Sequence, residues 1–199
     1  MQAAASYIEA HGWELAGFVA TALGIWLTAR RNMLCWPITL VADVVYLIVF
    51  YKVQLLSDTL LQVFFIAFTL YGWWHWRRGV QRDGEVRVTP LRLRDGAIAV
   101  VAGVAGTMVL GAIAKRLGAS LPYMDAALAS FSLVASWWQA RKHVANWWTW
   151  IVVDVLYVGE YVYKDLWLTA VLYAVLVGLA VVGLRDWTAA SHRVDELVS

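Results

Sequence analysis

The chain has 199 residues, of which 62% are hydrophobic and 15% are charged. A soluble domain usually has roughly 45–50% apolar and about 25% charged residues, so this composition indicates a membrane protein rather than a soluble one. The formal net charge of +2 gives no reason to expect a nucleic-acid partner, because the basic residues lie between apolar segments, and the single cysteine, Cys35, excludes a disulfide framework.

Apolar runs separated by charged residues predict an all-α membrane protein with seven transmembrane helices. One crossing of a bilayer takes about 20 mostly apolar residues, and this composition suits helices much better than the alternating strands of a barrel. The N-terminal stretch has no Lys or Arg, so it lacks the basic region of a cleaved signal peptide. The predicted spans lie near 12–29, 34–51, 58–76, 96–114, 122–140, 145–163 and 166–186.

The distribution of basic residues predicts the orientation of the spans. The loops after the first, third and fifth spans and the C-terminal end hold Arg30, Arg31, Arg77, Arg78, Arg82, Arg87, Arg92, Arg94, Arg141, Lys142, Arg185 and Arg193. The opposite face holds only Lys52, Lys115, Arg116 and Lys164. Because cytoplasmic loops carry an excess of Lys and Arg, we expect the N-terminus outside and the C-terminus in the cytoplasm.

Two single residues in the second and third spans have alternative interpretations. Pro37 follows Trp36 near the start of the second span, where proline is tolerated, and marks either a helix start or a hinge. Gln62 is the lone amide in LLQVFFIAF and needs a hydrogen-bonding partner or a ligand, since an unpaired amide in hydrocarbon is costly. The third span ends in LYGWWHWRR at 70–78, which is typical of an aromatic belt at the cytoplasmic interface.

The polar segments divide the chain. Residues 77–95 are predicted to be a linker that is too short for a domain, and residues 188–199 a frayed polar tail. The span near 96–114 is made largely of Gly, Ala and Val, small residues that let neighbouring helices approach closely.

An internal repeat relates the two halves of the chain. Segment 26–76 aligns with 137–187 without a gap, and 12 of the 51 positions are identical. We call two residues that this alignment pairs repeat partners. The Trp, Asp, Tyr and Gly pairs among them indicate a duplicated three-helix unit.

A unit of three helices crosses the membrane an odd number of times, so a second unit that followed directly would have the opposite orientation. Two units of the same orientation need one extra crossing between them. The small-residue span is this crossing, which gives a 3+1+3 parallel repeat. We therefore divide the chain into a first repeat (1–77), a linker and inversion helix (78–118), and a second repeat with a short tail (119–199).

The stretch NWWTW at 146–150 is either an interface belt or a place where a flat ligand binds. Residues spaced by about four positions share one helical face, and Trp147 lies one step aside from this face. The face contains Asn146, Trp150, Asp154 and Tyr157, and its repeat partners are Cys35, Thr39, Asp43 and Tyr46. The two faces are expected to line a common cavity.

Asp43 and Asp154 lie near the middle of their spans, where a bare charge costs at least ~2.5–3.5 kcal/mol. Two interpretations stay open. In the first, the carboxyl groups line a water-filled pathway, bind a cationic substrate or carry a proton. In the other, they are neutral or hydrogen-bonded across helices and lock the second span to the sixth. No metal-protease, esterase or phosphate-loop motif is present, so no catalytic residue, metal or cofactor is predicted.

Several motifs resemble those of the PnuC family of bacterial vitamin transporters. They are Trp36–Pro37, LLSDTLLQVFF with Gln62, LYGWWHW at 70–76, ARKHVANWWTW at 140–150, and Asp125 with Ser132 in the fifth span. The resemblance implies a full-length SWEET-like fold in the bacterial inner membrane, with assembly as a homotrimer. It implies that Asn146, Trp147, Trp150 and Gln62 contact the ligand, with Trp36 and Tyr157 as neighbours.

The same resemblance implies that the chain carries nicotinamide riboside, or alternatively thiamine or another vitamin, by facilitated diffusion, and that a cytoplasmic kinase traps the vitamin. Both vitamins have a cationic aromatic ring, which binds well between tryptophan faces, at ~0.5–2 kcal/mol per contact. A proton-coupled carrier that uses Asp43 or Asp154, and a membrane protein that transports nothing, are the other hypotheses.

Overall fold

The computed structural model describes the backbone of residues 2–52, 54, 56–78 and 86–198, and the side chains of 16–52, 54, 59–78, 86–167 and 169–191. Its regular elements in these ranges are seven helices. They are α1 (Gln2–Ala29), α2 (Cys35–Lys52), α3 (Leu56–Arg78), α4 (Leu93–Arg116), α5 (Pro122–Ala140), α6 (Ala145–Tyr163) and α7 (Trp167–Val198). Each predicted span corresponds to one helix, which confirms the all-α fold class.

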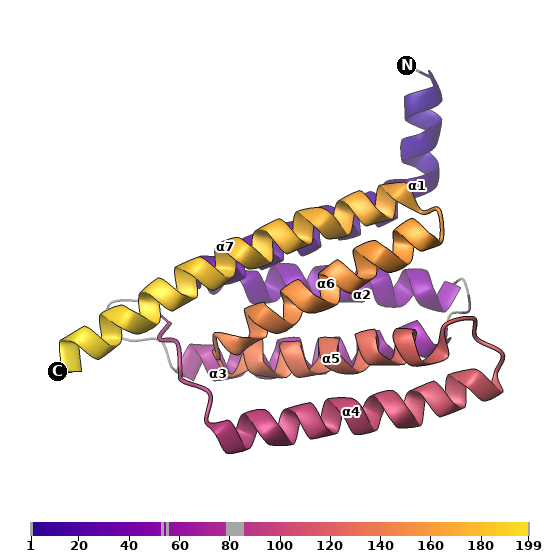
Figure 1. The fold of residues 1–199 in the computed structure, drawn as a ribbon. Helices are drawn as coiled ribbons and strands as arrows, with labels where there is room; N and C mark the ends of the chain where they lie inside the picture. Colours follow the sequence, from indigo (N-terminus) through magenta and orange to yellow (C-terminus); the bar gives the residue numbers. More distant parts are fainter. Residues whose placement is uncertain (1, 53, 55, 79–85, 199) are drawn as a thin grey trace.

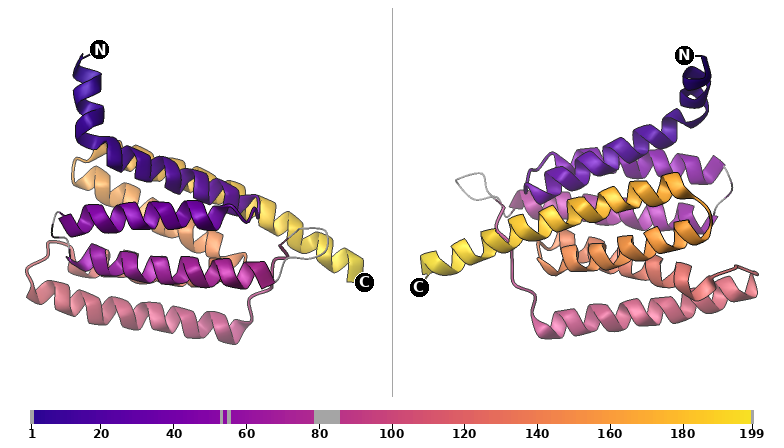
Figure 2. Two further views of the ribbon diagram at one scale, coloured as in Figure 1. Left: turned by 180° about the vertical axis from the view of Figure 1, so that it is seen from behind. Right: turned by 45° about the horizontal axis from the view of Figure 1, so that its top comes forward.

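Six of the helices form a closed ring. Going round it, α1 packs on α2, α2 on α3, α3 on α5, α5 on α6, α6 on α7, and α7 again on α1. Among the described residues, α4 packs on α5 alone and lies outside the ring, along one side of the bundle (Figure 1). Figure 2 shows the same arrangement from behind, with the helices running roughly parallel or antiparallel to one another. The ring, without α4, is what surrounds the candidate site.

The turns between helices recur at repeat partners. Arg31 and Lys142, which follow α1 and α5, have positive φ angles of 55° and 66°. Gln54 and Asp165, which follow α2 and α6, have φ angles of 60° and 56°. Positive φ is uncommon in residues other than glycine, so two such pairs of repeat partners show that the same backbone turns occur in both halves.

The halves also share a close contact between an indole ring and a glycine. A Cβ atom on Gly72 would lie 2.1 Å from the Trp36 ring, and one on Gly183 would lie 2.5 Å from the Trp147 ring. Glycine is therefore required at both positions if the second and third helices of each half are to pack with a tryptophan between them. This explains why both the Trp pair and the Gly pair are identical in the alignment.

Two further tryptophans connect the halves. Trp76 Nε1 donates a hydrogen bond to the Gln139 carbonyl oxygen at 3.3 Å, and Trp187 Nε1 donates to the Thr28 carbonyl oxygen at 3.0 Å. Thr28 and Gln139 occupy equivalent positions in the two halves, and so do Trp76 and Trp187. The third helix of each half thus bonds to the first helix of the other half, which closes the ring at this end.

The main core lies at the same end of the bundle. It contains the buried rings of Trp36, Trp76, Trp147 and Trp187, with centroid separations of 5.1, 5.7 and 5.4 Å along this cluster. The described part of the 77–95 linker packs onto it: Val86 and Val88 are buried in the same core. Thr89 then pairs with the α5–α6 turn, where its N–H donates to the Lys142 carbonyl oxygen at 2.9 Å. The described part of the linker after residue 85 therefore belongs to the packed structure.

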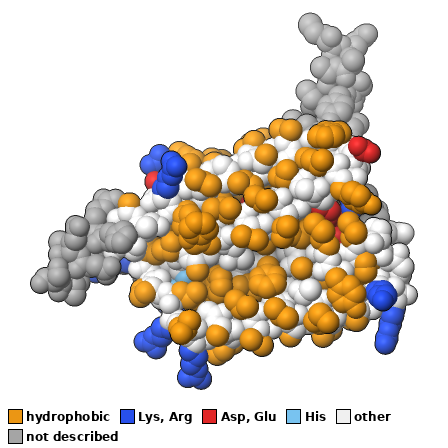
Figure 3. Space-filling model, viewed as in Figure 1, with side chains coloured by type: hydrophobic (Ala, Val, Ile, Leu, Met, Phe, Trp, Pro, Cys, Tyr) orange, Lys and Arg blue, Asp and Glu red, His pale blue; other side chains and the backbone are white. Residues whose placement is uncertain are grey.

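The outer surface is largely apolar. Three helical segments among the described residues are long and apolar enough to cross a membrane, namely Cys35–Lys52, Leu93–Arg116 and Thr169–Ser191. Figure 3 shows hydrophobic side chains spread over the length of one face, with Lys and Arg gathered near its ends. The helices α3, α5 and α6 fall outside this set, since they carry Gln, Ser, Asp and Tyr side chains, several of which face the interior.

The prediction for the C-terminal tail is wrong, and the prediction of an aromatic belt at 70–78 is wrong for one of its residues, Trp76. The predicted frayed tail at 188–199 is helical to Val198, because α7 continues past Trp187 and buries Ala190. Trp76 is fully buried in the core, so it is not part of an aromatic belt. Trp74 on the same helix is exposed, with the Arg78 guanidinium 3.9 Å from the centre of its ring, as an interfacial residue would be.

Candidate functional site

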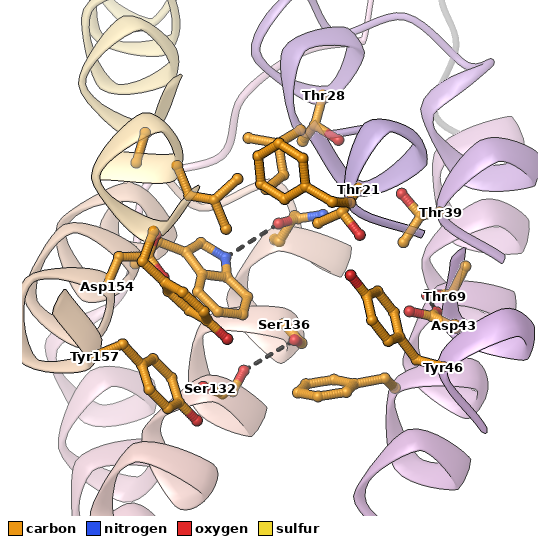
Figure 4. Close-up of a pocket in the computed structure, with 18 of the residues that line it drawn as sticks. Thr21, Thr28, Thr39, Asp43, Tyr46, Thr69, Ser132, Ser136, Asp154 and Tyr157 are labelled. Carbon is orange, nitrogen blue, oxygen red and sulfur yellow. Dashed lines mark hydrogen bonds between the residues drawn. The ribbon is translucent and has the colours of Figure 1, made fainter. Parts of the chain in front are cut away.

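A cavity of about 360 Å³ lies inside the ring. All six ring helices contribute to its lining, and α4 does not. Figure 4 shows Asp43 and Tyr46 on one side of it and Asp154 and Tyr157 on the other. A cavity of this size falls within the ~300–1,000 Å³ range of small-molecule sites, which are mostly apolar with a few convergent polar groups.

The two mid-helix carboxyl groups line the cavity in different environments. Thr69 Oγ1 of α3 donates a hydrogen bond to Asp43 Oδ2 at 2.8 Å, which ties α2 to α3. The repeat partner of Thr69 is Ala180, which has no hydroxyl group. No side chain in the described ranges donates a hydrogen bond to Asp154, although Asp154 is buried. Of the structural interpretation, the hydrogen bond across helices is present for Asp43, but it joins α2 to α3, and the lock between α2 and α6 is wrong.

Trp150 is held by an amide from the neighbouring helix. Its Nε1 donates a hydrogen bond to Gln139 Oε1 of α5 at 3.2 Å. Trp150 and Gln139 both line the cavity. The hydrogen bond limits rotation of the indole, so the ring presents a defined flat surface to the cavity.

Trp36, Trp147 and Gln62 also line the cavity, and each is buried. The Nε1 atoms of both indoles and Oε1 of Gln62 are buried without a hydrogen-bonding partner among the described residues. Buried polar groups are normally paired, so these atoms are candidates for bonding to a ligand or to ordered water. Tyr157 lines the cavity as well and stacks against Tyr161 with ring centroids 5.9 Å apart.

Asn146 is the exception among the predicted contact residues. It is fully buried, but it lies outside the set of residues that line the cavity. Its Nδ2 donates a hydrogen bond to the His143 carbonyl oxygen at 2.6 Å, within the turn that precedes α6. Its Oδ1 is buried without a partner in the described part of the chain. In this conformation Asn146 orders the start of α6, and the shared-face prediction applies to Trp150, Asp154 and Tyr157.

Several lining residues were not predicted from the sequence. Ser136 and Gln139 are two of them, and they share one face of α5 with Ser132, which belongs to the motifs of the family resemblance. Tyr161 and Tyr173 complete an aromatic cluster with Tyr157. The repeat offers a signal for one of them, because Tyr173 is the repeat partner of Gln62, which was predicted. Asp125, another residue of the family motifs, lies outside the cavity lining. Its Oδ1 forms an ion pair with Lys164 Nζ at 3.9 Å, where α5 begins and α6 ends.

The charge of the lining limits what the cavity can hold. Asp43 and Asp154 are its acidic residues, and none of its described lining residues is Lys, Arg or His. A phosphate group would bring negative charge next to two carboxyl groups without a basic partner, which is unfavourable in a site of low dielectric constant. The described residues also contain no group of three or more His, Cys, Asp or Glu that could hold a metal ion.

Comparison with known proteins assigns the family. The model of the nicotinamide mononucleotide transporter family matches residues 11–189. The riboflavin/roseoflavin transporter RibM of Streptomyces davaonensis is 28% identical over 183 residues, which cover 90% of this chain and 84% of RibM. The nicotinamide riboside transporter PnuC of Escherichia coli is 27% identical over 206 aligned positions, which cover 90% of this chain and 86% of that transporter.

A crystal structure of the vitamin B3 transporter PnuC has the same fold, with a TM-score of 0.76 at 21% sequence identity over 94% of this chain and 85% of that one. The apolar helices agree with the membrane location of such proteins. Because the family model matches most of its length, this chain belongs to the nicotinamide mononucleotide transporter family, in which PnuC is found, and is a multi-pass membrane transporter rather than an enzyme.

Proposed function

We propose that this protein imports nicotinamide riboside across the bacterial inner membrane by facilitated diffusion. The observation that carries the proposal is the aromatic cavity inside the ring, with two carboxyl groups and no basic residue among its described lining residues. A pyridinium ring gains from cation–π contacts with indole and phenol faces, worth ~0.5–2 kcal/mol each, and its charge is opposite to that of the carboxylates. The absence of a cationic lining residue in the described ranges favours the riboside over its phosphorylated nucleotide.

The predicted contact residues have distinct roles in this proposal. Trp150, with Trp147 and Trp36 beside it, stacks on the pyridinium ring, while Gln62 hydrogen-bonds the carboxamide or ribose through its unpaired buried oxygen. Tyr157 and Asp154 add aromatic and anionic contacts for the vitamin farther along α6, toward the outer end of the cavity in the proposed orientation. Asn146 shapes the start of α6, and its unpartnered oxygen contacts the ligand after a change in side-chain conformation.

The membrane arrangement follows from the helices and the charges. We infer seven crossings with the N-terminus outside and the C-terminus in the cytoplasm, in agreement with the basic residues at the α1–α2 and α5–α6 turns. We also infer that the halves 1–77 and 119–199 are a parallel duplication of the SWEET type, with 78–118 as linker and inversion helix. The matched turns, the matched Trp–Gly contacts and the reciprocal Trp hydrogen bonds support this arrangement.

The partners of the transporter are also part of the proposal. A cytoplasmic kinase phosphorylates the imported vitamin and so prevents its return, since the cavity disfavours phosphate. The exposed apolar face of α4 lies against lipid or against a second copy of the chain in a homotrimer. No catalytic step by the chain itself is required.

Thiamine is the second candidate, because its thiazolium ring carries the same positive charge. Riboflavin is the third, because RibM, a riboflavin/roseoflavin transporter, is 28% identical to this chain. Riboflavin is uncharged, so it could donate hydrogen bonds to the carboxylates but would gain no charge–charge attraction from them. The charge of the lining therefore ranks both cationic vitamins above it.

Uptake of labelled nicotinamide riboside into proteoliposomes tests the proposal, with thiamine and riboflavin as competitors. We expect saturable uptake that nicotinamide riboside competes best, with a greater accumulation when a nicotinamide riboside kinase and ATP are enclosed. Trp150→Ala should reduce uptake at least tenfold, whereas Trp148→Ala, at a neighbouring residue that is 61% exposed and outside the lining, should not. Uptake of another vitamin alone, or of none, would refute the substrate assignment.

A further inference from the structure

The aromatic residues of the cavity form two groups at different depths along α6. Trp147 and Trp150 lie in its first two turns, and Tyr157 and Tyr161 lie in its second half. At 1.5 Å per residue, Tyr157 lies about 10 Å and Tyr161 about 16 Å from Trp150 along the helix axis. A pyridinium ring stacked on Trp150 does not also stack on Tyr161 at that distance, so the tryptophan and tyrosine groups can act as separate binding positions.

The tyrosine group consists of three rings in mutual contact. The ring centroids of Tyr157 and Tyr173 are 4.7 Å apart, those of Tyr161 and Tyr173 are 5.2 Å apart, and those of Tyr157 and Tyr161 are 5.9 Å apart. All three line the cavity. On the proposed orientation, the C-terminal end of α6 faces the outside, so this cluster lies nearer to the outer entrance than Trp150 does.

A carboxyl group lies one helical turn before the cluster. Asp154 precedes Tyr157 by three residues on α6, and Figure 4 shows both facing the cavity. Asp154 is 5% exposed and receives no hydrogen bond from a described side chain, because Ala180 occupies the position that corresponds to Thr69. A buried carboxyl group normally has a partner, since burying a charge without one is costly. Its position beside three π faces fits a cation as that partner.

The first half of the chain is built differently at the equivalent positions. Tyr46 and Phe50 stack with ring centroids 5.8 Å apart, but Gln62 takes the place of Tyr173, and Asp43 is already bonded to Thr69. The three-ring cluster with an unbonded carboxyl group is therefore a feature of the second half alone. A purely structural role inherited through duplication would have left similar groups in both halves.

We propose that Tyr157, Tyr161 and Tyr173, together with Asp154, form a second and outer binding station for a positively charged aromatic ring. The station captures the ring through cation–π contacts and carboxylate attraction before the ring moves inward to Trp150. The order in which the ligand meets the two positions rests on the proposed function. The outer binding station itself depends only on the chemistry of its four residues.

The test separates the π faces from the hydroxyl groups and from packing. The double variant Tyr161→Leu/Tyr173→Leu removes two π faces, and Tyr161→Phe/Tyr173→Phe keeps them. Tyr163→Leu, at a residue of the same helix that is 77% exposed and outside the lining, is the matched control. For the wild type and each variant, binding is measured on the full chain in nanodiscs, with 1-methylnicotinamide, a small pyridinium cation, and with neutral nicotinamide. Initial uptake of nicotinamide riboside is measured separately, in proteoliposomes.

We expect the double Leu variant to bind 1-methylnicotinamide about 5- to 30-fold more weakly, with neutral nicotinamide changed less than twofold. The double Phe variant and Tyr163→Leu should behave as the wild type. The station is refuted if the Leu variant weakens both compounds equally, if it weakens neither, or if the Phe variant loses as much as the Leu variant. If binding changes as expected but the wild type takes up no nicotinamide riboside, the station stands and the proposed function fails.

Discussion

The contact between Gly183 and Trp147 provides the sharpest test of how the two halves are built. Replacing Gly183 by alanine would place a Cβ atom 2.5 Å from the indole. The indole cannot move away freely, because its other side packs edge-on against Trp187, with ring centroids 5.4 Å apart and an interplanar angle of 88°. Overpacking of this kind typically costs about 1–3 kcal/mol.

A control in the same helix isolates this effect from helix propensity. A Cβ atom on Gly178 would meet nothing within 4 Å, so Gly178→Ala should gain the roughly 0.5–1 kcal/mol by which alanine exceeds glycine in a helix. Gly183→Ala receives the same gain, but the steric cost exceeds it. The two variants should therefore differ by about 1–3 kcal/mol in the free energy of unfolding, with Gly183→Ala the less stable.

Thermal denaturation of the detergent-solubilised protein measures the difference. For a chain of this size, 1 kcal/mol corresponds to about 2–4 °C in Tm, so Gly183→Ala should melt roughly 2–12 °C below Gly178→Ala. Because Trp147 lines the cavity, uptake should also fall in Gly183→Ala alone. The close packing of the Trp147 ring on Gly183 is refuted if the two variants have the same Tm, or if both melt above the wild type.

Three further outcomes are expected. Thr69→Val should lower stability by about 1–3 kcal/mol, because Asp43 loses its hydrogen bond, whereas Thr107→Val, whose hydroxyl bonds only its own helix at Gly103, should be nearly neutral in the same melting assay. Burial lowers the pKa of His143 from its usual 6.5, so as the pH falls the unfolded chain protonates at His143 before the folded chain does. The free energy of unfolding should therefore decrease as the pH falls below about 6.5. His143→Gln should make this dependence of stability on pH weaker. If Asp154 carries a proton rather than facing a cationic ring, uptake should respond to an imposed pH gradient, and Asp154→Asn should abolish that response; we expect no response in the wild type.

The internal repeat shows how much of the candidate site could be predicted from the sequence alone. The alignment of the two halves identified Trp36, Trp147, Asp43 and Asp154 as paired positions, and all four line the cavity. Residues that are identical in both halves were thus found because the same packing is required twice. Residues at which the halves differ, such as Gln62 and Tyr173, give no identity, so only one member of that pair was predicted.

Asn146 and Trp76 show where spacing along a helix misleads. Asn146 shares the face of Trp150 by spacing, but it lies in the first turn of α6, where its amide bonds the His143 carbonyl oxygen instead of facing the cavity. Trp76 lies beside Arg77 in the sequence, as an interfacial residue does, yet a hydrogen bond to Gln139 on another helix holds it in the core. In both cases a local hydrogen bond or a distant helix decides the environment.

The seven helices and their approximate bounds could be predicted from the sequence alone, and so could the 12 identical positions that relate its two halves. The helices could be predicted because a helix in a membrane satisfies its backbone hydrogen bonds within its own segment, so its existence depends on local composition. Which face of each helix points into the cavity could be seen only in the folded structure. Lipid and protein core are both apolar, so hydrophobicity does not distinguish them. The rotation of each helix is set by contacts such as Trp147 on Gly183 and Trp187 on Thr28, which join residues far apart in the chain.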